Sequence, residues 1–354
     1  MLKSFPCMQI RGGSSKGLYF RAQDLPSRES ERNRVLLDAL GRDERQIDGL
    51  GGANPLTSKV AIVSPSERDD ADVDYLFVQV VVGENRVDTT PNCGNILAGV
   101  GAFAIETGML AVTSDETRIR VFMVNSGNRC ELVMQTPQGQ VEYQGETHID
   151  GVPGSAAPVL CNYLDLAGSA CGSLLPTGNV NDQIQGVAVT CIDNGMPVVV
   201  IAAESLGKNG YETCAALETD NDFKSRLESI RIEAGQRMKL GDVSHKVVPK
   251  MSLISPPRSG GHICTRSFIP HRCHAAIGVL GAVSVATACI LPGSVADGIA
   301  RVPDGNHKNI SVEHPSGEFT VELSLDDAGK VITVGLLRTT RLLSKGEVYV
   351  PGSL

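Results

Sequence analysis

Two stretches of this chain contain no charged side chain: residues 89–105, TTPNCGNILAGVGAFAI, and residues 275–296, AAIGVLGAVSVATACILPGSVA. The second is almost long enough to cross a membrane, but it is built from small residues and is interrupted by Pro292 and Gly293. A helix that is apolar on every side belongs in a protein core, and small residues let neighbouring strands approach it closely. We therefore predict two central core helices and no membrane span.

The two uncharged stretches also resemble each other, about half the chain apart. The matching pairs are Cys93 with Cys273, Gly101 with Gly281, Ala102 with Ala282, and Thr107 with Thr287. A repeat of this length predicts two related domains, each with strands wrapped around one buried helix. A chance similarity between two helices rich in small residues is the alternative.

Most of the remaining chain has the pattern of β-strands. Apolar and β-branched runs such as VDYLFVQVVV, TRIRVFMV, GVAVTCI and FTVELSL are separated by glycine, proline and asparagine. Helical patterns are clearest at residues 28–40 and 222–235. Strands and amphipathic helices do not alternate evenly, which argues against a doubly wound nucleotide-binding sheet. The predicted fold class is α+β.

The length of 354 residues favours two domains. We place an N-terminal domain at residues 1–150 and a C-terminal domain at 151–335. Residues 336–354 are expected to form a strand segment that packs back on the first domain.

Charge and cysteine usage exclude several classes of function. A net charge of -8 and the absence of tryptophan argue against a nucleic-acid partner. The first residues lack a signal-peptide pattern, and the ten cysteines are scattered without a CxxC pair, so we expect reduced thiols in a cytoplasmic protein. The spacing also predicts no zinc ribbon and no thioredoxin-like site, and we expect no metal.

Cys93 lies in the segment PNCGN, at the expected start of the first uncharged helix. The free N–H groups and positive end of a helix favour a thiolate there, and they would also hold a substrate carboxylate. Cys93 is therefore a candidate acid or base beside Asn92, Gly94 and Asn95. A buried structural cysteine is the alternative.

Lys59 follows the loop GGANPLTS and opens the apolar strand VAIV. Burial disfavours the charged form of an amine, so a lysine against a dry interior could accept a proton as a general base. A solvated lysine at a strand end is the alternative.

The segment RGGSSKG, residues 11–17, lacks the spacer of a phosphate loop, which argues against an ATP site. Its glycines would still let backbone N–H groups approach a ligand, and Ser14, Ser15 and Lys16 could contact carboxylates. A tight turn with exposed side chains is the alternative.

A second basic segment, CTRSFIPHRCH, precedes the second uncharged helix. It places Arg266, Arg272 and His274 near the expected helix start, where guanidinium groups make a good carboxylate clamp. Binding of a metal by this segment together with His262 is the less favoured interpretation, because one strand and turn rarely supplies four converging ligands.

Taken together, these motifs resemble the PrpF-type isomerases, and within them the group of 4-oxalomesaconate tautomerases. The likeness spans nearly the whole chain. The segments that carry it are RGGSSKG, QIDGLGGANPLTSKVAIV, DVDYLFVQV, PNCGNILAGVGAFAIE, DGVPG, TCIDNGMPVV, LGDVS, RSFIPHRCH and EHPSGEF.

The resemblance implies the diaminopimelate-epimerase-like fold, with two pseudo-symmetric domains that each wrap strands around a central helix. It implies that Lys59 and Cys93 carry proton transfer, without a cofactor, on a small polycarboxylate. The substrate-binding residues predicted with them are Arg11, Ser14, Ser15, Lys16, Ser58, Asn92, Gly94, Asn95, Arg266 and His274. A homodimer is left open.

The predicted reaction is a 1,3-allylic proton shift, equivalent to keto–enol tautomerisation, of 4-oxalomesaconate or a related tricarboxylate in the breakdown of aromatic acids such as gallate and protocatechuate. Three alternatives stay open. They are a methylaconitate-type cis–trans isomerase, an epimerase that uses Cys93 and Cys273 as a pair, and a binding protein that only retains the fold.

Overall fold

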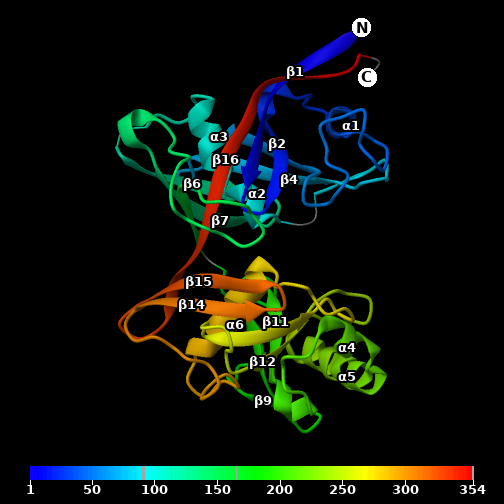
Figure 1. Cartoon of the computed structure of the whole chain (residues 1–354), viewed down its shortest axis with the longest axis vertical. Coiled ribbons are helices and arrows are strands. Elements are labelled where there is room, and N and C mark those ends of the chain that lie inside the picture. The colour runs from blue at the N-terminus through cyan, green and yellow to red at the C-terminus, as the bar shows by residue number, and fades with distance from the viewer. Residues whose placement is uncertain (90–91, 113, 165, 353–354) are drawn as a thin grey trace. The chain divides into compact units, whose positions relative to one another are not determined.

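A computed structural model of the chain describes residues 1–89, 92–112, 114–164 and 166–352. The chain divides into two compact units (Figure 1). Unit 1 comprises Met1–Leu164 and Leu337–Leu354, and unit 2 comprises Asp165–Leu336. The chain up to Leu164 stays with unit 1 because the strand Pro158–Leu164 pairs with the strand Asn128–Gln135. The C-terminal segment enters unit 1 by pairing with the first strand.

Unit 1 is a mixed sheet with helices on both of its faces. Its strands are β1 (Leu2–Gly12), β2 (Ser15–Arg21), β3 (Lys59–Pro65), β4 (Val73–Val80), β5 (Val87–Asp88), β6 (Glu116–Met123), β7 (Asn128–Gln135), β8 (Pro158–Leu164) and the later part of β16 (Val331–Pro351). Its helices are η1 (Ala22–Asp24), α1 (Glu29–Leu40), α2 (Gly94–Leu97), α3 (Val100–Glu106) and η2 (Pro137–Gly139).

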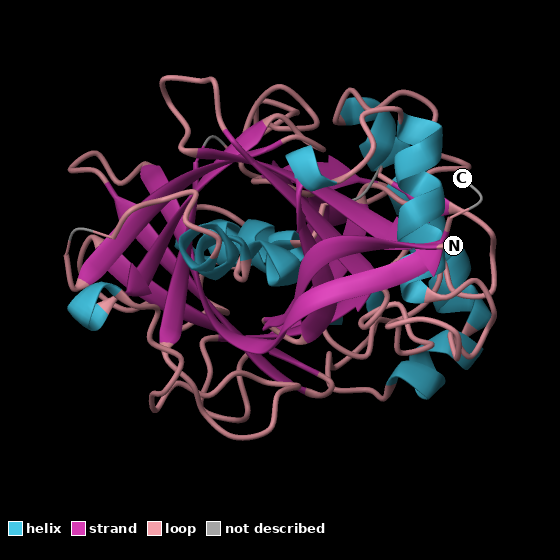
Figure 2. Cartoon of the chain, turned by 90° about the horizontal axis from the view of Figure 1, so that it is seen from above, coloured by secondary structure: helices cyan, strands magenta, loops and turns pink. Residues whose placement is uncertain are grey.

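The strands of unit 1 close around α2 and α3. The order runs β1-β2-β3-β4-β6-β7-β8-β16, and β16 also pairs with β1. A Cβ atom on Gly99 would lie 2.4 Å from the Tyr19 hydroxyl, and one on Gly101 would lie 2.6 Å from Met134 Sδ. Strands on opposite sides thus approach the helix too closely for any larger residue. Within the uncharged segment, α2 and α3 form the predicted central helix, and Figure 2 shows magenta strands on both sides of the cyan helices at the centre of the view.

The opposite face of the sheet is covered by α1. Val60 and Ile62 of β3 belong to one buried cluster with Val35 and Leu36 of α1. Because side chains alternate across a strand, Lys59 and Ala61 point to the other face, toward α2 and α3. This alternation decides which candidate residues can share a site.

Unit 2 has the same construction. Its strands are β9 (Asp182–Ile184), β10 (Val187–Asp193), β11 (Pro197–Ala202), β12 (Lys250–Ser255), β13 (Ile263–Phe268), β14 (His307–His314), β15 (Gly317–Leu325) and the start of β16. Its helices are η3 (Ala203–Leu206), α4 (Cys214–Thr219), α5 (Asn221–Arg237) and α6 (Val279–Ile290). Helix α6 contacts β10, β11, β14 and β15, whereas α5 packs beside β9 and β12.

The order of strand pairing shows that the predicted duplication is correct. From β1 to β8 the successive pairs are antiparallel, parallel, antiparallel, parallel, antiparallel and antiparallel. The same series runs from β10 to β16. The helices α3 and α6 occupy the same place in the two series, between the fourth and fifth strands.

The two core helices are not identical in detail. In unit 1 the helix begins at Gly94 and is interrupted at Ala98 and Gly99, whereas α6 begins only at Val279. Cys93 is therefore the residue before a helix, but Cys273 forms a β-bridge with Phe268. The sequence alignment of the two cysteines does not make them structurally equivalent.

The polar residues of the second uncharged stretch are satisfied inside unit 2. Ser284 Oγ donates to Met196 O at 2.7 Å, and Thr287 Oγ1 donates to Val283 O at 2.8 Å. Among the helices that the structure describes, none combines the length and the apolar character needed to cross a membrane. The helices expected at 28–40 and 222–235 correspond to α1 and α5.

Candidate active site

The turn between β1 and β2 packs directly against the start of α2. Gly13 has φ +51°, and a Cβ atom there would stand 2.2 Å from Asn95 Oδ1, so only glycine fits. Asn95 Nδ2 donates a hydrogen bond to Ser14 Oγ at 3.1 Å. The structure therefore brings the predicted RGGSSKG turn and the NCGN segment together.

Lys59 is the first residue of β3 and is 9% exposed. Its Nζ donates to Gln79 Oε1 at 2.7 Å and lies 5.0 Å from the centre of the Phe77 ring. Within the described residues, the amine therefore has one polar partner and an aromatic neighbour. This is the largely buried environment that the sequence predicted for Lys59.

Lys59 and α2 lie on either side of Gly17. A Cβ atom on Gly17 would be 2.5 Å from Lys59 O and 3.2 Å from Ile96 Cδ1. The missing side chain of Gly17 allows β3 and α2 to approach at this point. A substitution at Gly17 would push the lysine and the helix apart.

Cys93 is partly exposed and directly precedes α2. Its carbonyl oxygen accepts a hydrogen bond from Tyr75 Oη at 3.2 Å. Tyr75 and Phe77 are two residues apart on β4 and therefore point to the same face of the sheet. Phe77 lies beside the Lys59 amine. Lys59 and Cys93 are thus both anchored to one face of one strand.

Two buried tyrosines, which the sequence analysis missed, position α2. Tyr19 Oη donates to Ile96 O at 2.6 Å, and Tyr75 Oη holds Cys93 as described. Burial, and then the negative charge that Cys93 would carry as a thiolate, raises the pKa of both phenols well above their ordinary value. They remain neutral hydrogen-bond donors. In the sequence, these tyrosines could be noticed only as tyrosines within apolar strands. Such tyrosines are common in ordinary protein cores, so they do not indicate a site.

Ser15 has a buried hydroxyl without a partner. The residue is 2% exposed, and its Oγ has no hydrogen-bond partner among the described residues. On β2, every second residue points to the face that meets α2, and these residues are Ser15, Gly17 and Tyr19. An unpaired buried hydroxyl destabilises a protein by about 1–3 kcal/mol, so a ligand atom at this position would be favoured.

Asn92 and Gly94 flank Cys93 at the beginning of α2. Asn92 is exposed and Gly94 is partly exposed, so both can be reached by a ligand. The first N–H groups of a helix have no partner within the helix. Because α2 has only four residues, individual N–H groups are the relevant donors here, and the helix dipole expected from the sequence is weak.

Three other predicted binding residues of unit 1 are placed differently from our expectation. Arg11 and Lys16 point to the opposite face of the sheet, because they alternate with Gly12 and Ser15, which face α2. Ser58 is fully buried, and its Oγ donates to Gln46 Oε1 at 2.6 Å and to Asn54 O at 2.9 Å. It orders the loop before Lys59 and is closed to a ligand.

In unit 2, Arg266 is 8% exposed and is held by backbone carbonyls. Its Nε donates to Glu212 O at 2.7 Å and its Nη1 donates to Thr265 O at 2.8 Å. The predicted clamp of Arg266 with Arg272 is therefore not formed, since Arg272 is exposed and Arg266 is turned inward.

His274 is partly buried, and its Nδ1 accepts a hydrogen bond from Ala276 N at 2.8 Å. Burial, and then the positive charge of Lys250, lowers the pKa of His274. Its imidazole is neutral at physiological pH, with Nδ1 as the acceptor, so it would donate to a ligand through Nε2. A role for His274 in substrate binding stays a prediction.

Cys273 has the environment of a core residue. It is 7% exposed, belongs to a buried apolar cluster, and lies beside Cys214. Burial, and then its interaction with Cys214, raises the pKa of Cys273 to about 12. Its place among the apolar core side chains of unit 2 argues against an epimerase that uses Cys93 and Cys273 as a pair.

Comparisons with known proteins identify the family of the chain. The family model described as "PrpF protein" matches residues 2–351. The chain belongs to the PrpF family. Two of its relatives are a 4-oxalomesaconate tautomerase from Pseudomonas putida, 59% identical over 98% of this chain and 96% of the relative, and a (4E)-oxalomesaconate Delta-isomerase from Novosphingobium, 55% identical over 99% and 98%.

A solved structure confirms the fold. The crystal structure of a methylitaconate-delta-isomerase superposes with a TM-score of 0.91 at 32% identity, covering 99% of this chain and 96% of that one. The fold and family implied by the sequence motifs are thus both confirmed. Among the described residues, no group of three or more His, Cys, Asp or Glu side chains is arranged to hold a metal.

Gln79 is expected to position the Lys59 amine. Besides accepting from Lys59, its Nε2 donates to Ser58 O at 2.9 Å and to Pro55 O at 3.2 Å. Gln79→Leu removes both functions, so we expect kcat to fall about tenfold with a smaller change in KM. Steady-state kinetics on Gln79→Leu and Gln79→Glu test this, since Gln79→Glu keeps an acceptor for the amine. A loss of thermal stability in Gln79→Leu with unchanged kcat would mean that Gln79 only holds the loop.

Proposed function

We propose that this chain is a 4-oxalomesaconate tautomerase, an isomerase that moves a proton between the two ends of an allylic system. The observation that carries the proposal is the identity of 59% and 55%, over nearly the full length, to two relatives with this activity. The juxtaposition of Lys59, Cys93 and the β1–β2 turn gives the proposal its chemistry.

Lys59, in its neutral form, removes a proton from the carbon activated by the conjugated carbonyl and alkene. The electron pair moves into the conjugated system and forms a dienolate. Its negative charge requires nearby hydrogen-bond donors, because stabilising developing charge is usually the largest catalytic contribution. The unpaired hydroxyl of Ser15 and the first N–H groups of α2 are the donors on the same face as Lys59.

Cys93 then delivers a proton from its thiol to the other end of the conjugated system and completes the 1,3 shift. Lys59 afterwards releases the proton that it removed to solvent, and the Cys93 thiolate takes one up, so both groups return to their starting states. Overall one C–H bond breaks and one forms, the double bond moves by one position, and no electrons are gained or lost. The reaction therefore needs no cofactor. Asn95 keeps the β1–β2 turn and α2 in register through its hydrogen bond to Ser14.

A cytoplasmic location fits this function and is part of the proposal. All ten cysteines, buried and partly exposed alike, are free thiols in the structure, which supports a reducing compartment. A homodimer stays a prediction.

Incubation with 4-oxalomesaconate in deuterium oxide tests the proposed function. We expect proton NMR to show formation of the allylic isomer with deuterium at the carbon that receives the proton. Methylaconitate serves as the comparison substrate, and its conversion should be at least about tenfold less efficient. Preferred conversion of methylaconitate would replace the proposal by a cis–trans isomerase, and binding without exchange would replace it by a binding protein.

A further inference from the structure

We propose that unit 1 carries a second anion-binding site, for a small dicarboxylate or a phosphate, in the cavity formed by Arg11, Arg341 and the segment 143–156. The cavity has a volume of about 200 Å³. Its lining residues are Arg11, Tyr143, Gln144, Thr147, Ile149, Val152, Pro153, Gly154, Ser155, Ala156, Thr339 and Arg341, and none of them is acidic. All of them belong to unit 1.

The strand register places Arg11 and Arg341, which both line this cavity, beside each other, with Lys16 next to Arg11 outside the cavity lining. Arg11 of β1 pairs directly with Arg341 of β16 on one side and with Lys16 of β2 on the other. Side chains at directly paired positions point to the same face, and like charges there destabilise a sheet. Arg341, Arg11 and Lys16 therefore form a row of three positive charges on adjacent strands. A bound anion would reduce the repulsion between these charges.

The hydrogen bonds of Arg11 leave part of its guanidinium available. Nη1 donates to Gly13 O at 2.9 Å, Thr339 O at 3.1 Å and Thr339 Oγ1 at 3.0 Å. The other two guanidinium nitrogens have no acceptor among the described residues. Because Nη1 fixes the plane of the group, Nε and Nη2 form a preorganised fork of the kind that binds carboxylate or phosphate.

Arg341 supplies the second charge. The residue is exposed and lines the same cavity, and its side chain has no hydrogen bond or ion pair within the described part of the chain. Burial, and then the charge of Arg341, lowers the pKa of Arg11, so the two guanidinium groups interact across the cavity. A freely solvated pair of arginines would show neither the burial of Arg11 nor the enclosing segment.

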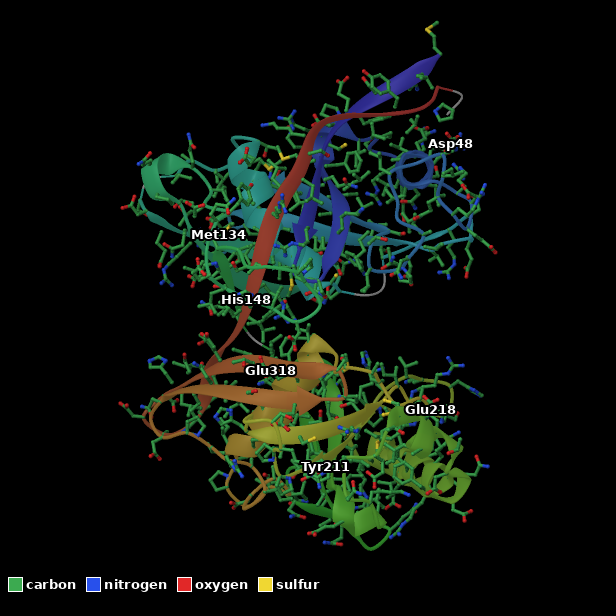
Figure 3. All side chains as sticks on the ribbon, in the orientation of Figure 1. Asp48, Met134, His148, Tyr211, Glu218 and Glu318 are labelled. Atoms are coloured by element: carbon green, nitrogen blue, oxygen red, sulfur yellow. The ribbon has the colours of Figure 1, made fainter. Side chains whose placement is uncertain are left out.

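The enclosing segment is a closed loop. Thr147 and Ala156 exchange two backbone hydrogen bonds, Thr147 N to Ala156 O at 3.0 Å and Ala156 N to Thr147 O at 3.1 Å. The residues between them turn back through Gly151 and Gly154, both at positive φ. His148, labelled in Figure 3, marks this loop beside β16. The loop contributes Ser155 and Thr147 as uncharged polar groups that can bind an anion.

Arg11 lies on the opposite face of the sheet from Lys59, although the enclosing loop reaches the β1–β2 turn, where a Cβ atom on Gly151 would lie 3.4 Å from Ser14 Cβ. Gly12 faces α2, because a Cβ atom on it would lie 2.3 Å from Asn95 O, and Arg11 therefore points away from α2. The inference does not depend on the proposed tautomerase activity. The cavity of about 200 Å³ is smaller than most ligand pockets, which restricts the ligand to a small anion.

Isothermal titration of the full chain with inorganic phosphate and with malonate, at constant ionic strength, tests the proposal. We expect one of the two anions to bind at millimolar concentration or tighter, and Arg341→Gln to weaken that binding at least about tenfold. Arg45→Gln is the matched control, because it removes one positive charge from an 81% exposed side chain of unit 1. The anion that binds more tightly shows whether the site prefers a phosphate or a dicarboxylate.

Three results would contradict the proposal of a second, separate anion site. One is the absence of binding of either anion to the wild type. Another is an equal loss of affinity in Arg45→Gln, which would indicate general surface charge. The third is a parallel rise in KM for the tautomerase substrate in Arg341→Gln, which would make the cavity part of the substrate site. Because Arg341 is exposed, we expect the variant to fold.

Discussion

Replacement of Lys59 by methionine is expected to lower kcat for 4-oxalomesaconate by about 10³-fold or more, because general-base catalysis contributes about 10²–10⁴-fold. Methionine has a similar length and would pack against the Phe77 ring that the lysine now contacts. The fold should therefore persist while the proton acceptor is lost. Stopped-flow absorbance of the conjugated substrate measures kcat, and a thermal melt measures folding.

The control for Lys59→Met is Lys3→Met, which removes a lysine from an exposed position of β1 in the same unit. We expect its kcat and KM to stay within about twofold of the wild type. Binding of a non-reactive tricarboxylate to Lys59→Met should weaken far less than kcat falls. A rate near that of the wild type would refute the role of Lys59 as base, whatever the binding result.

The absence of charge was the most reliable structural signal in the sequence. A helix without charged residues belongs in a protein core, so the helices within the two uncharged stretches could be assigned to the two cores before the fold was known. The pairing of strands could not be predicted in the same way. Partners such as β1 and β16 are distant in the chain, and their register depends on contacts that no local pattern records.

The candidate site divides in a similar manner. Lys59, Cys93, Ser15 and Asn95 were predicted because turn residues and short motifs mark positions where the backbone approaches a ligand, and their roles in the site stay predictions. The direction of a side chain was harder to predict. Arg11 and Lys16 have suitable chemistry, but a one-residue alternation sends them to the other face of the sheet.

Polar side chains that are already hydrogen-bonded within the protein are a second difference from the expectation. Ser58 and Arg266 were expected to bind substrate, yet their hydrogen bonds go to Gln46, Asn54, Glu212 and Thr265. The partners of Ser58 lie in the loop before it, whereas Glu212 is distant from Arg266 in the chain. Neither set can be recognised from composition. The same reasoning explains why the Tyr19 and Tyr75 hydroxyls were missed: their acceptors are carbonyl groups of a remote helix.

Replacement of Cys93 by alanine is expected to lower kcat by about 10²-fold or more while leaving proton removal partly intact. If Lys59 removes the proton and Cys93 delivers it, Cys93→Ala should still exchange the substrate proton with deuterium oxide. Proton NMR of the remaining substrate should then show deuterium faster than product accumulates. Lys59→Met should show neither exchange nor product.

The matched control is Cys273→Ala, because this thiol is packed in the core of unit 2 with a pKa near 12. We expect a loss of stability of about 1 kcal/mol and a kcat within about twofold of the wild type. An epimerase with two catalytic cysteines would instead lose activity equally in both variants. If Cys93→Ala abolished exchange as completely as Lys59→Met, the division of labour between amine and thiol would be wrong, and both groups would have to act in the same proton transfer.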